Sequence, residues 1–434
     1  MGARVKLAIR LGALLSVGLG GPSLSIPSAE ACGAYFARQP ATVATASAQL
    51  FNHSTNMIVA RVDTTTTITM TADYRGDPTE FAVVIAVPTV LTREQIKTAD
   101  GKLIDMLDRM TAPRLTETYD ADPCPTRGSQ PLSKSRVGAP SLHSGHVPVA
   151  AAAPQSLGVT VEAQYLVGEY DISILSAVQS DGLRTWLNEA GYNVPAAAAP
   201  VLAAYIADGM KFFVAKVNLA KKQELGFAQL QPLQISYQSP KFMVPVRLST
   251  INAGGAQEMF IYLLTRKGRV ETTNYAVRTI PTQEEVPPFI KADYAAFYRA
   301  VFETAVRASS GRAVFIEHVG MIRKATAGAE ALRPLDQQLN QMGATWSGNV
   351  VLTRIHVRYD AEHFKSDLLF RETDAAKPFT SQFAIRHPYE GEASCPEGER
   401  YRVQLKARQQ RELANLARLT GWSSGDILEK SKTR

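Results

Sequence analysis

The stretch YDISILSAVQSDGLRTWLNEAGYNVP at residues 170–195, followed by YIADGMKFFVAKV at 205–217, decides the fold of this chain. Its two ends, 170–175 and 212–217, are short apolar and β-branched runs that predict strands. Between them, apolar residues recur at helical spacing around 183–187 and again from Pro200. Gly191 is expected to end the first of these helices, because glycine adopts the left-handed conformation with little strain. The unit is therefore predicted to be strand, helix, helix, strand.

Strands outnumber helices in the rest of the chain, and many follow one another directly. Apolar or β-branched runs predict them at 57–60, 64–70, 81–87, 159–175, 233–237, 243–248, 259–264, 314–316, 350–359 and 383–385. Residues 290–305 form a strongly amphipathic helix pattern. Thr92 and Gln95 have capping-box spacing and are interpreted as the start of a helix that continues through 103–110. The pattern predicts an α+β fold with largely antiparallel sheets and helical insertions, in one large domain or two tightly packed lobes.

The first thirty-one residues have the layout of a secretory signal peptide. Positive charges at residues 4, 6 and 10 precede a short apolar run, and an Ala-x-Ala site ends at Ala31, directly before Cys32. The apolar run is shorter than the about 20 residues that span a bilayer. We therefore expect cleavage between Ala31 and Cys32, and an exported, periplasmic or secreted protein. Lipid attachment at Cys32 is the less favoured alternative, because the charged Glu30 precedes it.

Composition along the chain predicts its domain organisation. The signal peptide covers 1–31, and an exported α+β domain covers 32–395. Residues 126–157 are rich in Ser, Pro, Gly and Ala and are interpreted as a low-complexity loop. A lobe boundary is expected near 281–289, where two prolines interrupt the pattern, and residues 396–434 form a basic helical tail.

Three cysteines are present: Cys32, Cys124 and Cys395. In an oxidising compartment two of them can pair, and one is left over. Cys124 and Cys395 both lie in proline-containing loops, so we expect a Cys124–Cys395 disulfide that ties the body to the start of the tail. A Cys32–Cys124 disulfide, or none at all, remains the alternative.

The positive charge of the chain is concentrated in its tail. The formal net charge is +7, and residues 400–434 contain nine Lys and Arg against three Asp and Glu. The body is close to neutral, which gives no reason to expect nucleic-acid binding. The helix pattern of 406–419 combines apolar Leu413, Leu416 and Leu419 with basic residues that are candidates for contact with a partner or a membrane: Arg402, Lys406, Arg408, Arg411 and Arg418. Such a helix either packs its leucines on the body or lies on an anionic membrane surface.

No catalytic or metal-binding motif stands out beyond residue 31. The sequence lacks H-E-x-x-H, P-loop and G-x-G-x-x-G patterns, and it has no Cys/His cluster with zinc spacing. Its one G-x-S-x-G match, GWSSG at 421–425, follows a predicted helix and not a strand, so it is not a nucleophile elbow. It therefore predicts no catalytic residue, no metal and no cofactor.

Several weaker candidates have simpler structural interpretations. His143 and His146 lie in the low-complexity loop, and Glu284-Glu285 precedes two prolines. His356, Asp360 and His363 could ligate a metal, but His356 lies in a predicted strand and need not share a face with the other two. Trp186 and Tyr192 could line a binding site, although Trp186 has the spacing of a core residue.

The segment 170–217 resembles a known family of exported bacterial proteins, grouped as domain of unknown function 2330. The W-L-N-x-x-G-Y block at 186–192 and the F-x-V-A-K strand at 212–216 carry the resemblance. It is supported by ACGAYF at 31–36, GDPTEFAVVIAVP at 76–88, LQPLQISY at 230–237 and LTRIHVRY at 352–359. The similarity runs from about Cys32 to Arg386, and LARLTGW at 416–422 is similar to tails in part of the family. The family usually begins with CGGFF, from which Ala34 and Tyr35 depart.

The resemblance implies export and a shared fold, but no reaction. We therefore expect an uncharacterised exported cell-envelope protein that is a non-enzymatic binding or structural component. Its partner would be an envelope protein or the membrane surface, reached through the C-terminal helix. The alternative is an exported hydrolase with an unrecognised active site.

Overall fold

The computed structural model of the chain describes residues 34–37, 54–71, 80–124, 158–218, 221, 224–225, 230–251, 255–325 and 334–432. The expected signal peptide, Cys32, and the loop 126–157 with His143 and His146 lie outside these residues. The described chain is α+β, as predicted.

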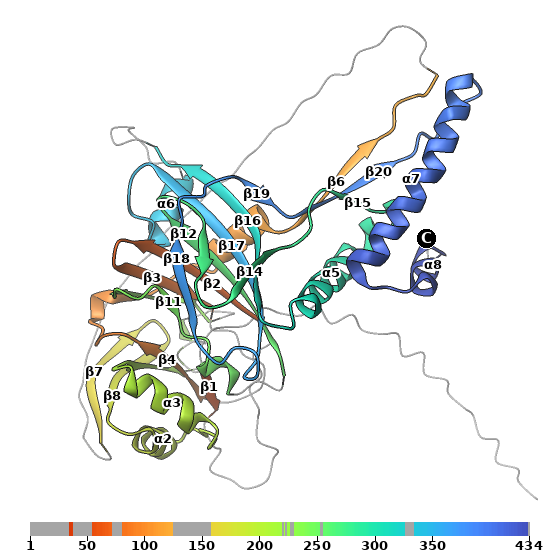
Figure 1. Cartoon of the computed structure of the whole chain (residues 1–434). Helices are drawn as coiled ribbons and strands as arrows, with labels where there is room; N and C mark the ends of the chain where they lie inside the picture. Colours follow the sequence, from red (N-terminus) through yellow and green to blue (C-terminus); the bar gives the residue numbers. More distant parts are fainter. Residues whose placement is uncertain are drawn as a thin grey trace, which may run out of the picture.

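One layer is a five-stranded antiparallel sheet. Its strand order is β1-β4-β9-β8-β7. The strands are β1 (Ala34–Ala37), β4 (Glu80–Val87), β9 (Lys211–Asn218), β8 (Tyr170–Ala177) and β7 (Val159–Val167). The helices α2 (Ser180–Glu189) and α3 (Ala198–Ala207) connect β8 to β9 and cover the outer face of this sheet (Figure 1). The predicted strand–helix–helix–strand unit is confirmed.

The second layer is a nine-stranded sheet with the order β14-β16-β17-β12-β2-β3-β10-β5, in which β19 pairs with β16. Most neighbours are antiparallel, whereas β12 runs parallel to β2, and β14 parallel to β16. The strands are β14 (Ala276–Thr279), β16 (Ala313–Arg323), β17 (Asn349–Tyr359), β12 (Gln257–Thr265), β2 (Ser54–Val62), β3 (Thr65–Met70), β10 (Leu233–Gln238), β5 (Ile96–Thr98) and β19 (Phe379–Thr380). The helices α1 (Lys102–Thr111) and α6 (Pro334–Gln341) cover its outer face. A small sheet of β11 (Met243–Val244), β18 (Leu368–Glu372) and β13 (Val270–Thr272) lies beside it.

The main core lies between these two sheets. The alternation of side chains along each strand explains which residues belong to it. In β4, Val83 and Ile85 point into the core between the sheets, whereas Ala82, Val84 and Ala86 pack against α2 and α3. Successive side chains of a strand point to opposite faces. Because both faces of this strand are buried, its sequence is a continuous apolar run instead of an alternating one.

A separate unit extends from this sandwich, and we call it the arm (Figure 1). It comprises a three-stranded parallel sheet, ordered β15-β20-β6, and the helices α7 and α8. The strands are β15 (Glu284–Glu285), β20 (Gln382–His387) and β6 (Arg114–Tyr119), and the helices are α7 (Pro396–Thr420) and α8 (Ser424–Lys432). The arm shares an apolar core with α5 (Tyr294–Ala308) and with the start of β16. Segments 281–289, where a lobe boundary was expected, contribute β15 and the first turn of η3 (Pro288–Asp293).

Two helix predictions need correction. The C-terminal helix begins at Pro396, well before residue 406, with Cys395 as its N-cap residue. Its first turns were missed because residues 397–404 are mostly exposed and polar and show little apolar periodicity. Thr92 and Gln95 do not begin α1. They belong to the short η1 (Arg93–Gln95), where the backbone N–H of Thr92 donates to Gln95 Oε1 at 2.7 Å, and β5 intervenes before α1.

Candidate functional site

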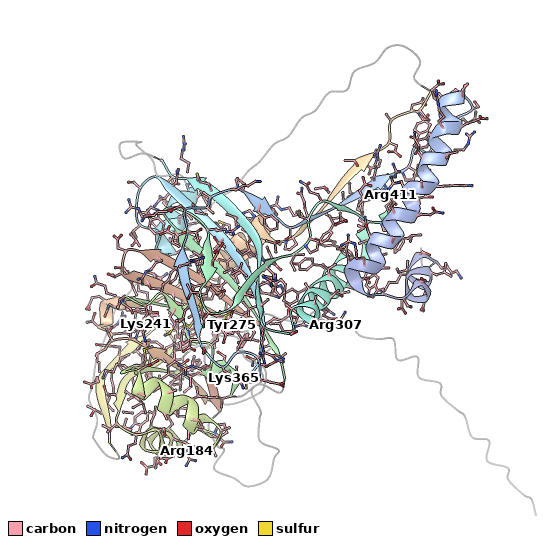
Figure 2. All side chains as sticks on the ribbon, viewed as in Figure 1. Arg184, Lys241, Tyr275, Arg307, Lys365 and Arg411 are labelled. Carbon is pink, nitrogen blue, oxygen red and sulfur yellow. A yellow bond between two sulfur atoms is a disulfide. The ribbon has the colours of Figure 1, made fainter. Side chains whose placement is uncertain are left out.

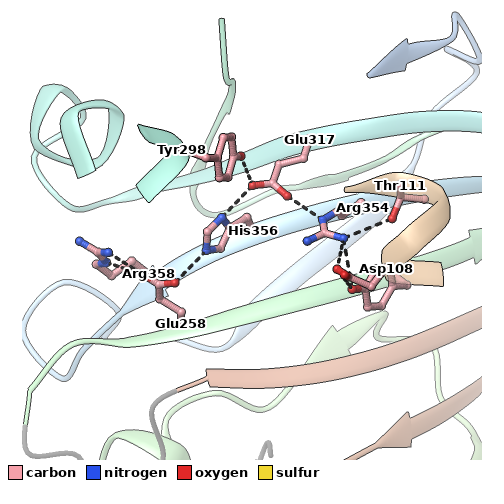
Figure 3. A network of polar contacts seen from close by, with 9 residues as sticks. Asp108, Thr111, Glu258, Tyr298, Glu317, Arg354, His356 and Arg358 are labelled. Carbon is pink, nitrogen blue, oxygen red and sulfur yellow. Dashed lines mark hydrogen bonds and ion pairs between the residues drawn. The ribbon is translucent and has the colours of Figure 1, made fainter. Parts of the chain in front are cut away.

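The most concentrated chemistry in the described chain is a buried network of charged side chains on the nine-stranded sheet (Figure 3). Arg354, His356 and Arg358 alternate along β17 and therefore share one face. In the register, Glu258 of β12 lies opposite Arg358, and Phe260 lies opposite His356. The network continues from β17 to β12, β16, α1 and α5.

Glu317 of β16 is the centre of this network and is fully buried. Its Oε2 accepts from Arg354 Nε at 2.6 Å, and its Oε1 accepts from His356 Nδ1 at 2.8 Å and from the hydroxyl of Tyr298. The pairing of β16 with β17 shifts register between Ile316 and His318, so Glu317 lies in a bulge. A bulge re-aims a side chain relative to the regular pleat, and here it accompanies a carboxylate directed at β17.

His356 is held between two carboxylates and two aromatic rings. Its Nε2 lies 3.3 Å from Glu258 Oε2, on the side opposite Glu317. The ring of Phe302 stacks on it at a centroid distance of 3.5 Å, and that of Phe260 at 4.1 Å. Burial by itself lowers the pKa of His356, but the carboxylates of Glu317 and Glu258 outweigh it and raise that pKa. The charged form of the imidazole is therefore favoured.

The outer ends of the network reach the surface of the sheet. Arg354 Nη1 donates to Asp108 Oδ1 of α1 at 2.6 Å, and the hydroxyl of Tyr262 donates to the same oxygen at 3.0 Å. At the other end, Arg358 Nε donates to Glu258 Oε1 at 3.0 Å. Three carboxylates thus face three cations when His356 is protonated. Burial raises the pKa of Glu317, but His356 and Arg354 outweigh it and keep that pKa below its usual range.

This arrangement leaves little room for catalysis by His356. A general base needs a free ring nitrogen within reach of a substrate or nucleophile. Both nitrogens of His356 face carboxylates, and both ring faces are covered by phenylalanines. Within the described residues, no group of three or more His, Cys, Asp and Glu side chains is placed to hold a metal ion.

The sequence named Asp360 and His363 as possible co-ligands of His356 but favoured a strand followed by a polar loop, and the structure keeps the two groups apart. His363 pairs with Asp360, with its Nδ1 2.8 Å from Oδ2, and not with His356. The true partners Glu317 and Glu258 are 39 and 98 positions away. The available signal was the alternation of three cationic side chains in an otherwise apolar strand, which predicts one charged face.

The second notable site is the junction that holds α7 on the arm, where Asp120 lies just beyond β6. Asp120 Oδ1 accepts from Arg408 Nη1 at 2.9 Å and from Arg386 Nε at 2.5 Å. Its Oδ2 accepts from Arg408 Nη2 at 2.8 Å and from the hydroxyl of Tyr401 at 2.7 Å. Burial opposes ionisation of Asp120, but the hydrogen bonds from Arg408, Tyr401 and Arg386 outweigh it, so its pKa is well below the usual range. This cluster fastens α7 to the sheet.

A disulfide joins Cys124 to Cys395 beside this cluster, with an S–S distance of 2.08 Å. This is compatible with the pairing expected from the sequence. Cys395 Sγ also accepts from the backbone N–H of Gly398 at 3.2 Å, which caps the first turn of α7. The start of α7 is therefore fixed by a covalent bond as well as by ion pairs.

The basic residues proposed for partner contact fall into two groups. Arg402, Lys406, Arg411 and Arg418 are exposed on α7, and Figure 2 labels Arg411 there. Arg418 also pairs with Glu284 at 2.8 Å. Arg408 is the exception and corrects the prediction, because its side chain is 8% exposed and bound to Asp120 and Glu412. It faces the arm because it lies on the same side of the helix as Leu416 and Leu419.

The leucines of α7 mostly pack on the protein. Leu416 and Leu419 are buried in the apolar cluster that also contains Phe297, Phe302 and Ile385, whereas Leu413 is 41% exposed. The packing alternative of the sequence analysis therefore holds for two of the three leucines, and these are not free to enter a bilayer. None of the described helices has the length and apolarity needed to cross a membrane.

The remaining candidates are structural or unremarkable. Tyr192 is 5% exposed, and Trp186 of α2 packs against the same apolar cluster. Gly191 has a φ of 92°, which glycine adopts without strain. The backbone C=O of Glu285 accepts from Asn415 Nδ2 at 3.2 Å, so the Glu284–Glu285 pair contacts α7 and is no isolated catalytic dyad.

Comparison with known proteins gives one match. Neither a curated protein nor a solved structure matches the chain. Residues 26–371 match the model of a family described as an uncharacterized protein conserved in bacteria, DUF2330. The matched segment contains both sheets of the sandwich except β19, together with β6 and α5, whereas β19, β20, α7 and α8 follow it. The chain therefore belongs to the DUF2330 family.

Proposed function

We propose that this protein is an exported, non-enzymatic component of the bacterial cell envelope, which binds an anionic membrane surface through the outer face of α7. The observation that carries the proposal is the division of this helix into two faces. One face is fixed to the arm by Asp120 and the buried leucines. The opposite side is turned to solvent with Lys406, and Arg402 and Arg411 are exposed toward its two edges.

The binding would be electrostatic and peripheral. Leu416 and Leu419 are occupied by the arm core, so insertion of an apolar helix face is not available. Exposed basic residues near an anionic bilayer contribute about 1 kcal/mol each, and salt screens this attraction. Val403 is 71% exposed on the same helix and would add a small apolar contact.

Export is supported by the signal-peptide pattern and by the disulfide, which persists in oxidising compartments. A non-enzymatic role is supported by the engagement of both nitrogens of His356 with carboxylates. No specific observation favours the hydrolase alternative.

Vesicle sedimentation tests the membrane proposal. The purified chain is mixed at low salt with vesicles of phosphatidylcholine, with or without phosphatidylglycerol. We expect binding only to the anionic vesicles, and its loss at about 0.5 M NaCl, where the screening length is a few ångströms. The variant Arg402→Gln, Lys406→Gln, Arg411→Gln should bind about a hundredfold more weakly, from about 3 kcal/mol of lost attraction.

A matched control removes the same charge from the sandwich instead. Lys97, Lys241 and Lys365 are exposed and form no side-chain hydrogen bond or ion pair within the described chain; Figure 2 labels the last two. Their replacement by Gln should leave vesicle binding nearly unchanged. Equal losses in the two triple variants would mean that net charge, and not α7, causes the binding. Absence of binding to anionic vesicles would refute the membrane proposal and favour an acidic protein partner.

Intact mass of the protein purified from its own envelope tests export independently. A mature chain that begins at Cys32 without acyl mass is expected. A chain that retains residues 1–31 would contradict export by this signal.

A further inference from the structure

A pocket of about 480 Å³ opens at the junction of the arm, between the end of β6, β20 and the first two turns of α7. Its lining includes Asp120, Arg386, Arg400 and Gln404. The volume lies within the range of small-molecule sites, about 300–1,000 Å³. The pocket does not overlap the outer face of α7 that carries the proposed function.

The one buried acid of the pocket is already saturated. An ionised carboxylate has about four acceptor positions. Asp120 uses all four, for Arg386, Tyr401 and the two Nη atoms of Arg408. It therefore fixes the arginines in place and has no acceptor position left for a ligand.

The other polar groups that line the pocket beside Asp120 are mainly hydrogen-bond donors. Arg386 uses its Nε on Asp120, and within the described residues its two terminal nitrogens have no partner. Arg400 uses Nη2 on Glu397 at 2.6 Å, which leaves its Nη1 and Nε available. The side-chain amide of Gln404 likewise has no hydrogen bond within the part of the chain described. Two guanidinium forks and an amide thus line one pocket.

The charges of the lining balance, with Asp120 and Glu397 against Arg386 and Arg400, and Arg408 behind Asp120 is also paired with Glu412. Because Asp120 has no acceptor position left, a ligand meets mainly the remaining nitrogens of the two lining arginines, and these favour an anion. Arginine binds carboxylates through paired, planar hydrogen bonds. Ala121 and Pro123 provide an apolar part of the wall. We propose that this pocket binds a carboxylate, carried by a small acid or by the end of a peptide, with its apolar substituent against Pro123.

The probes that test this are N-acetylalanine, its neutral amide N-acetylalaninamide, and the longer acid N-acetylalanylalanine. Binding is followed by NMR shifts of the side-chain N–H groups of Arg386, Arg400 and Gln404 in the full chain. The two acids should give saturable shifts of these signals in the millimolar range, and the amide should give none. Tighter binding of the longer acid would identify a peptide end, and equal binding a small acid. Equal shifts with acid and amide, or none with either acid at about 50 mM, would overturn the proposal.

Single substitutions distinguish specific recognition of the carboxylate from nonspecific attraction to positive charge. Arg400→Gln should weaken binding of N-acetylalanine about ten- to a hundredfold, as loss of a charged hydrogen bond does. Lys406→Gln removes the same charge from the same helix outside the pocket, and should change binding by less than about twofold. Arg386→Gln also removes a hydrogen bond of the Asp120 cluster, so Arg400, which is exposed and pairs with Glu397 alone among the described residues, decides the test. Equal losses for Arg400→Gln and Lys406→Gln would reject a specific site.

Discussion

His356 Nδ1 and Glu317 Oε1 lie 2.8 Å apart in the interior of the nine-stranded sheet, and both side chains are almost completely removed from solvent. Together with Glu258 they form a carboxylate–imidazole–carboxylate triad, which needs the imidazole in its charged form. Such a pair makes the stability of the fold dependent on pH.

The first prediction concerns this pH dependence. In the folded chain, burial lowers the pKa of His356, but the charges of Glu317 and Glu258 outweigh burial and raise that pKa. Its contribution is therefore fully present below the unfolded value, about 6.5, and is lost as the pH rises through the folded pKa. Urea unfolding from about pH 5 to 9 should show that the free-energy difference between the wild type and His356→Gln is largest at the acidic end and shrinks with rising pH. A difference that grows with pH would contradict a charged His356.

Removal of the central carboxylate should be more damaging. Glu317→Gln leaves Arg354 and His356 buried without their shared counter-ion, which costs about 3–5 kcal/mol in comparable buried pairs. Urea unfolding at pH 6 measures this loss. The matched change Glu362→Gln, at an exposed position whose side chain has no hydrogen bond within the described chain, should stay within about 0.5 kcal/mol. A small effect for Glu317→Gln would mean that the network is solvated or rearranged.

Asp120 should control the docking of α7. Asp120→Asn leaves Arg408 half paired in a buried position, so α7 should loosen while the sandwich stays intact. Hydrogen exchange should accelerate in 401–412 and remain unchanged in β12 and β17, and Asp374→Asn, at an exposed position, is the control. Because the pKa of Asp120 is lowered, its contribution is present above the unfolded value of about 3.9 and is lost only as the pH falls through the lower folded value. The helix should therefore remain docked at pH 5, and its release there would count against this account.

The disulfide and the Asp120 cluster should act together. The variant Cys124→Ser, Cys395→Ser should lower the free energy of unfolding by about 2–4 kcal/mol, and expose the first turns of α7 to exchange. Addition of Asp120→Asn should cost less than the sum of the separate losses, because both contacts fix the same helix end. Thiol titration of the unreduced wild type should find one free thiol per chain, that of Cys32. Three free thiols would show that the disulfide is absent.

The buried leucines of α7 should behave as core residues. Leu416→Ala should destabilise the protein by about 2–5 kcal/mol, because it opens a cavity among Phe297, Phe302 and Ile385. Leu428, 54% exposed on α8, provides the comparison, and its change to Ala should cost less than about 0.5 kcal/mol. Similar losses at the two positions would mean that α7 does not pack as described.

Local patterns predicted a good part of this fold. The strand–helix–helix–strand unit, the apolar strand β4 and the left-handed Gly191 after α2 all follow from periodicity and from the backbone freedom of glycine. Errors arose where a local signal was weak or belonged to a different element. Thr92 and Gln95 cap a short 3-10 turn and not α1, and the polar first turns of α7 lack an apolar stripe because the helix touches the arm there at only a few positions.

Side-chain spacing over a few residues is enough to set which segments become strands and helices. It also determined that β17 carries three cations on one face. Only the tertiary structure decided what these cations meet. Glu317 reaches His356 across a bulged pair of strands, and Asp120 reaches Arg408 across 288 positions of chain. Such contacts depend on register and packing, which no local window contains, and so the buried network and the arginine-lined pocket emerge only when distant segments pack together.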